Sequence, residues 1–329
     1  MSDTILYDSA MRLFGDHVSP RILAAAETGS WAGPLWDAVT EAGYLDVLVE
    51  GPGGMVEATT ILRAAGHHAA PIPLPETMLA RWLCAAAGVE APAGSLTIAL
   101  LNPGDPIGRA GPAPWGRTAI ALAVVAGSTL CLAGRDQVRF EPGRNLAGEP
   151  RDRLLGIVSA PPVPLSGAVS AETVRGIGAL MRSAQMAGAM EAALELSTRY
   201  ANDRVQFGRA IGKFQAIQQQ MALLAEEAAA ALVAVESAAR SVAGARPSAE
   251  LAVAAAKIRT GEAAGSVAEI AHQVHGAIGF TAEHSLHHLT RRLWSWRDEF
   301  GDEAYWAAAL GRRVAAAGPE GLWNLITRP

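Results

Sequence analysis

Cysteine, aromatic residues and lysine are all scarce in this chain of 329 residues. Its only cysteines, Cys84 and Cys131, are too few for a disulfide framework and suit a reducing compartment. Aromatic residues make up 5% of the chain although 50% of it is apolar, because much of the apolar content is alanine. Alanine is the strongest helix former, so the composition favours a mainly helical protein with a sizeable core.

Basic residues are outnumbered, and long apolar runs are missing. The chain has 27 Lys and Arg against 32 Asp and Glu, a net charge of -5, and its only lysines are Lys213 and Lys257. This mildly acidic balance argues against nucleic acid or a phospholipid surface as the partner. No uncharged apolar run approaches the roughly 18 residues of a membrane-spanning helix, and the acidic start does not resemble a signal peptide. We therefore expect a cytoplasmic protein with no membrane span.

The hydrophobic pattern divides the chain into three predicted domains. Residues 1–93 have the pattern of short helices, residues 94–168 that of short strands, and residues 169–329 that of long helices packed as an antiparallel bundle. Helices are expected over residues 36–43, 55–68, 76–88, 170–204, 214–244 and 247–275. Strands are expected over residues 96–101, 118–126, 129–133 and 137–140. The predicted fold class is therefore mainly α with a small β domain, a small sheet or partial barrel.

Two segments at helix ends have the composition of a ligand-binding bend. The first, Arg204 to Gln215, joins two long predicted helices and combines arginine, glycine and glutamine, which can hold a phosphate by charge-assisted hydrogen bonds. The alternative is a helix-hairpin turn with an incidental surface arginine. The second, Gln273 to Phe280, closes the third long helix with glycines that bring backbone amides close to a ligand. A glycine C-cap is the alternative there.

Histidines and acids gather in the same part of the chain. Five of the eight histidines are His272, His275, His284, His287 and His288. Helical bundles bind metals through Glu-x-x-His motifs on separate helices, and this chain has neither that repeat nor a His-Glu-x-x-His motif, so no metal is expected. A third segment, Arg291 to Glu303, places acids beside aromatic residues, where a base with a tuned pKa is often built. Solvated acids beside a tryptophan-filled interface are the alternative.

Together these segments resemble motifs of the acyl-CoA dehydrogenase family. Arg204 to Gln215 is similar to the family's Arg-x-x-Phe-Gly-x-x-Ile-x-x-Phe-Gln segment, and Gln273 to Phe280 is similar to its Gln-x-x-Gly-Gly-x-Gly-Phe segment. The order of the three zones also resembles the family's helical N-domain, β-barrel middle domain (reduced here) and C-terminal four-helix bundle. The resemblance therefore spans nearly the whole chain.

The resemblance implies a flavoprotein that dehydrogenates an acyl-CoA thioester with FAD and passes electrons to an electron-transfer flavoprotein. In the family, the two segments serve the FAD of the neighbouring subunit. This implies Arg204 at the pyrophosphate and Gln273 with Gly276 along the ADP portion. The residues implied to bind the cofactor are Arg204, Gln206, Phe207, Ile211, Phe214, Gln215, Gln273, Gly276 and Ala277.

Several features of the family are missing from the sequence. Neither the Thr-Glu-x-x-x-Gly-Ser loop nor the Trp-Ile-Ser/Thr run that holds the isoalloxazine ring occurs between residues 94 and 168, and Ala277 replaces the second glycine of the Gly-Gly pair. The position of the family's catalytic glutamate falls on Phe300, one residue after Glu299. One residue on a helix is a rotation of about 100°, so Glu299 can be the base only where the chain has left the helix. Otherwise Phe300 occupies the space of the base.

These departures resemble the shorter subunit of the actinobacterial heteromeric (α2β2) enzymes, in which FAD and substrate lie between two different chains. Three hypotheses follow. The chain is a partner-dependent subunit with a second acyl-CoA dehydrogenase subunit, or it is a homo-oligomeric dehydrogenase with Glu299 or Asp298 as a displaced base. The third is a non-catalytic structural or FAD-edge subunit on the same fold.

Overall fold

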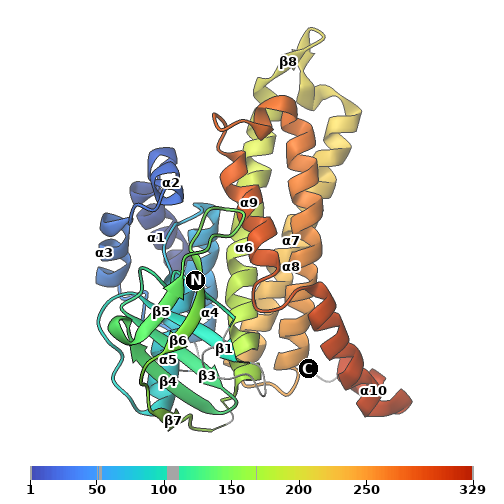
Figure 1. Ribbon diagram of the computed structural model, residues 1–329. Helices are drawn as coiled ribbons and strands as arrows, with labels where there is room; N and C mark the ends of the chain where they lie inside the picture. The colour runs from blue at the N-terminus through green and yellow to red at the C-terminus, as the bar shows by residue number, and fades with distance from the viewer. Residues whose placement is uncertain (1, 50, 52–53, 102–110, 168, 328–329) are drawn as a thin grey trace. The chain divides into compact units, whose positions relative to one another are not determined.

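The computed structural model describes residues 2–49, 51, 54–101, 111–167 and 169–327 (Figure 1). The chain forms two compact units. The bundle unit comprises Met1–Pro20, Thr59–Ala70 and Ala179–Pro329, and the strand unit comprises Arg21–Ala58 and Pro71–Gly178. The three domains expected at residues 1–93, 94–168 and 169–329 stay a prediction.

The strand unit contains two small sheets that share one core. The first sheet, in the order β1-β3-β4-β7, consists of β1 (Leu96–Leu101), β3 (Ala121–Ala126), β4 (Thr129–Gly134) and β7 (Pro162–Pro164). The second sheet, in the order β2-β6-β5, consists of β2 (Pro112–Pro114), β6 (Arg151–Ile157) and β5 (Val138–Glu141). Only β1 and β3 pair in parallel among these described strands. Buried side chains of both sheets, such as Leu122 and Leu154, form one apolar cluster, so the sheets pack against each other.

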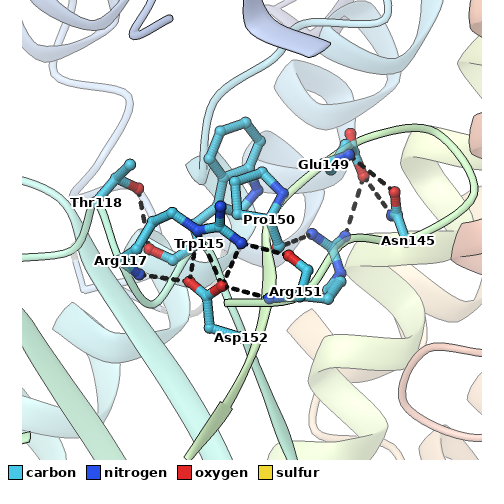
Figure 2. Close-up of polar contacts among 9 residues, drawn as sticks. Trp115, Arg117, Thr118, Asn145, Glu149, Pro150, Arg151 and Asp152 are labelled. Carbon is cyan, nitrogen blue, oxygen red and sulfur yellow. Dashed lines mark hydrogen bonds and ion pairs between the residues drawn. The ribbon is translucent and has the colours of Figure 1, made fainter. Parts of the chain in front are cut away.

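A buried carboxylate ties the loops of this unit together (Figure 2). Asp152 on β6 is 0% exposed and accepts hydrogen bonds from the backbone amides of Arg117 (2.6 Å) and Gly143 (3.1 Å). Its Oδ1 also accepts from the Arg117 guanidinium at 2.5 and 2.9 Å, and that guanidinium donates to the Gly143 carbonyl. A buried carboxylate is tolerated only when its oxygens are paired in this way. The network therefore fixes the turn after β2, where Trp115 has a φ of 58°.

The strand unit also contains helices, which are α2 (Pro20–Glu27), α3 (Gly33–Glu41) and α5 (Leu74–Ala87). One of them, α5, packs against the first sheet. Helix α5 starts with a proline in its first turn and ends at Gly88, which has a left-handed φ of 67°. The Thr77 hydroxyl both donates to the Leu96 carbonyl (3.0 Å) and accepts from its amide (3.1 Å), which joins α5 to the start of β1.

The bundle unit is built from long helices. They are α1 (Ser2–His17), α4 (Gly54–His67), α6 (Ala171–Asp203), α7 (Gln215–Ala243), α8 (Ala249–His275), α9 (Leu286–Arg297) and α10 (Glu303–Thr327). Helices α6, α7 and α8 run side by side (Figure 1). Helix α7 packs on α8, and alanine is the commonest buried residue on both. Helices α4 and α6 touch backbone to backbone, because a methyl group at Gly66 or Gly188 would overlap a main-chain carbonyl of the other helix. Small residues thus set the spacing of this bundle.

Every helix and strand expected from the sequence is present, with ends shifted by at most three residues. The sequence pattern did not predict the following elements individually: α1, α2, α9, α10, β2, β6 and β7. Strand β6 was missed because it carries three charged residues, and only the fold shows that one of them, Asp152, is buried. Cys84 and Cys131 are both buried and free. Within the described part of the chain, every helix is too short or too polar to cross a bilayer.

Candidate functional site

The Arg204–Gln215 segment forms a short hairpin between α6 and α7. Strands β8 (Val205–Gln206) and β9 (Arg209–Ala210) pair through Phe207 and Gly208, which have φ values of 52° and 79°. A 3-10 turn, η3 (Ile211–Lys213), then leads into α7. Among the predicted cofactor residues, the exposed ones are Arg204, Gln206, Phe207 and Gln215, and the half-buried ones are Ile211 and Phe214. Phe207 is 92% exposed, so this segment points away from the core, and a large apolar side chain is left uncovered.

The Gln273–Phe280 segment ends α8 with a glycine cap. Gly276 has φ 62° and ψ -144°, a conformation open only to glycine, and its amide donates to the His272 carbonyl. The 3-10 turn η4 (Gly276–Phe280) follows. Gln273, Gly276 and Ala277 are exposed. The C-cap is therefore present, and it leaves the backbone of this turn accessible, as a ligand would need.

Aromatic packing brings the two segments to the same end of the bundle. The Tyr200 ring, four residues before Arg204, stacks on the His275 ring with centroids 4.6 Å apart. His272 stacks between Phe280 (4.3 Å) and Trp294 (5.8 Å). Burial is the main cause that lowers the pKa of both His272 and His275, which favours their neutral form. These histidines therefore support the segments as packing groups.

The third segment contains a loop at the predicted base. Helix α9 stops at Arg297, α10 starts at Glu303, and Phe300 and Gly301 between them have φ values of 58° and 98°. Glu299 therefore lies outside the helix, which is the condition under which it can act as the base. The indole nitrogen of Trp306 donates to the Phe300 carbonyl at 3.1 Å and holds the loop from the α10 side.

The Glu299 carboxylate is turned toward a buried arginine. Its Oε2 lies 2.6 Å from a guanidinium nitrogen of Arg182 on α6, and the two side chains are 16% and 3% exposed. The same guanidinium donates to the Gln185 side chain at 2.5 Å and lies over the Trp296 ring at 5.6 Å. Glu299 is thus a counter-ion within the bundle as well as a loop residue.

A buried lysine next to this ion pair was missed by sequence reasoning. Lys257 of α8 is 1% exposed, and its Nζ donates to the carbonyl of Arg297 and, at 3.4 Å, to that of Trp296. Burial lowers the pKa of Lys257 from its usual 10.5 to about 8, although Glu303 and Glu299 oppose the shift. Its only sequence signal is rarity, as one of two lysines and within an apolar helical run.

Comparison with known proteins agrees with the helical fold. Residues 166–314 match the family described as Acyl-CoA dehydrogenase, C-terminal domain. Acyl-CoA dehydrogenase IpdE2 of Mycobacterium tuberculosis is 30% identical over 303 residues, which cover 88% of this chain and 89% of the relative.

Two solved structures share the fold, each with a TM-score of 0.81. The Tcur3481-Tcur3483 steroid ACAD is 23% identical and aligns over 96% of this chain and 98% of its own. A chain of the ChsE4-ChsE5 complex from Mycobacterium tuberculosis is 21% identical and aligns over 96% and 97%. With the IpdE2 identity over most of both chains, these findings show that this chain belongs to the acyl-CoA dehydrogenase family of flavoprotein oxidoreductases.

Proposed function

We propose that this chain takes part in the FAD-dependent α,β-dehydrogenation of an acyl-CoA thioester, as one subunit of a heteromeric enzyme. Family membership supports the reaction class. The observation that supports a heteromeric arrangement is that this chain has only some of the family's FAD-binding motifs. The exposed bundle-end segments are present, whereas the sequence between residues 94 and 168 lacks the motifs that hold the flavin ring. The similarity to the ChsE4-ChsE5 complex supports the same arrangement.

The exposed residues at the end of the bundle fit the pyrophosphate and ADP portions of FAD. Arg204 offers charged N–H donors, which suit a pyrophosphate, and Gly276 gives a ligand access to the backbone. We propose that the other contacts come from Gln206, Phe207, Ile211, Phe214, Gln215, Gln273 and Ala277. When bound, FAD supplies the hydride acceptor, and we propose an electron-transfer flavoprotein as its oxidant.

Glu299 is the candidate base within this chain. A base must come within about 2.6–3.2 Å of the proton it takes, and the loop over residues 298–302 frees Glu299 from the helical position that would exclude it. The rival base is a carboxylate of the partner subunit. The ion pair with Arg182 favours the rival, because a proton on Glu299 would remove a counter-charge from a buried guanidinium.

Substitution of Glu299 in the reconstituted complex separates these two bases. With Glu299 as the base, Glu299→Gln lowers flavin bleaching by an acyl-CoA by about 100-fold or more while FAD stays bound. Full activity assigns the base to the partner. Glu262→Gln, an exposed acid on α8, is the matched control, and Asp298→Asn tests the other displaced carboxylate.

The behaviour of the purified chain tests the wider proposal. If the chain purified without a partner binds flavin and dehydrogenates an acyl-CoA, the homo-oligomeric enzyme is favoured instead. A complex that binds no flavin and never bleaches with acyl-CoA would contradict the proposed function and leave a structural subunit.

A further inference from the structure

We infer that Lys257 is a positioning residue for the loop over residues 298–302, because its Nζ ends α9 and thereby sets where Glu299 lies. The inference deepens the proposed function and rests on it only in its last step, the effect on catalysis. Lys257 lies on a different helix from the loop and would touch neither FAD nor substrate, since it is 1% exposed.

The first support is the way in which α9 ends. The Trp296 carbonyl accepts the Glu299 amide at 3.2 Å, a tight turn rather than another turn of α-helix. The same carbonyl and that of Arg297 accept the Lys257 Nζ. Buried carbonyls at a helix end need a donor. Lys257 supplies that donor from α8.

The second support is a packing contact at the other end of the loop, where α10 begins. Gly261, one turn after Lys257 on α8, leaves room for the Glu303 carboxylate, because a methyl group at Gly261 would overlap it. Glu303 in turn accepts from the Arg297 Nε at 2.7 Å. Both ends of the loop therefore lie against one short stretch of α8, from Lys257 to Gly261.

The third support is the local charge pattern. The charged groups that act on the Lys257 ammonium are Glu303 on α10, Glu299 and Asp298 in the loop, and Arg182 on α6. Glu299 already faces Arg182, and Glu303 already faces Arg297. Both carboxylates thus have an arginine, so the hydrogen bonds of Lys257 to the α9 carbonyls, rather than a missing counter-charge, are what it adds to the loop.

The test is amide hydrogen exchange over residues 297–303 in the full chain. Lys257→Met removes the donor and keeps length and volume, and we expect at least about tenfold faster exchange, the loss of about 1.4 kcal/mol of local protection. Lys257→Gln retains an N–H donor and is expected to recover part of the protection. Arg259→Met is the matched control, since Arg259 lies on the same helix but pairs with Glu227, and its loop should exchange as in the wild type. Loop exchange within twofold of wild type in a folded Lys257→Met variant, or exchange no slower in Lys257→Gln than in Lys257→Met, would overturn the inference.

The wild-type chain supplies a test without substitution. Opening the loop lets water reach Nζ and returns its pKa toward 10.5, so loss of the proton above pH 8 favours the closed loop. Protection of these amides, corrected for intrinsic exchange, should therefore rise by up to about tenfold per pH unit between pH 8 and 9.5. Constant protection over that range would refute the positioning role.

The final step is measured in the reconstituted complex. Where Glu299 is the base, Lys257→Met is expected to lower kcat for flavin bleaching with little change in KM, and Lys257→Gln to restore part of kcat. If the loop of Lys257→Met exchanges faster but the wild-type complex shows no bleaching, the proposed function is contradicted and the positioning role stands. If the loop of Lys257→Met exchanges as in the wild type and the wild-type complex is active, the positioning role is contradicted and the proposed function stands.

Discussion

The buried ammonium of Lys257 predicts that stability increases at alkaline pH. Burial lowers the pKa of Lys257 to about 8 in the folded chain, against 10.5 when it is solvated. Below pH 8 the lysine is protonated in both states, and the full cost of burying its charge is present. Between pH 8 and 10.5 the unfolded state binds more protons, so the free energy of unfolding rises with pH. At 1.36 kcal/mol per pH unit, the gain is about 3 kcal/mol by pH 10.5.

Urea unfolding of the full chain, followed by helical circular dichroism, measures this gain. Other groups titrate over the same range, so the quantity of interest is the difference in unfolding free energy between wild type and Lys257→Met, in which they cancel. We expect the wild type to gain about 2–3 kcal/mol of unfolding free energy relative to Lys257→Met between pH 7 and 10. A difference that stays constant within about 0.5 kcal/mol would refute the assignment of a low-pKa buried lysine, because extrapolation errors are of that size.

Two further pairs of substitutions test the bundle and its exposed end. Gly188→Ala should destabilise the chain by about 1–3 kcal/mol in urea unfolding, since the methyl group would meet the backbone of Arg63, which cannot rotate away. Gly311→Ala on α10, with open space around it, should instead stabilise by about 0.5–1 kcal/mol, and an equal effect of the two would contradict the close α4–α6 contact. Arg204→Ala should weaken FAD binding by the complex tenfold to a hundredfold, about 1.5–3 kcal/mol for a charged hydrogen bond, with Arg199→Ala as control. Unchanged flavin occupancy at limiting FAD would remove Arg204 from the site.

Hydrophobic periodicity was enough to predict about half of the helices and strands. The long helices α6, α7 and α8 were predicted to within two residues, because each buries an apolar stripe that repeats at the helical period. The exposed position of the Arg204 and Gln273 segments also follows from sequence, since each lies in a turn between long helices. Motif spacing alone indicated the family.

Tertiary structure decided which charged residues are buried and what they touch. Asp152, Arg182 and Lys257 lie in stretches whose letters do not separate a solvated charge from a buried one. Burying each of them is favourable only because groups distant in the sequence supply its hydrogen bonds, as Arg117 does for Asp152. A pattern within one helix or strand contains no information about such partners.

The position of Glu299 also depends partly on the sequence and partly on the tertiary structure. The sequence set the condition, that Glu299 can serve as a base only outside the helix, because one residue of offset turns a side chain by about 100°. Whether α9 stops in time depends on a donor from α8 and on left-handed conformations at Phe300 and Gly301. The glycine is visible in the sequence, but the lysine 40 residues earlier acts on the Arg297 carbonyl only through the packing of two helices.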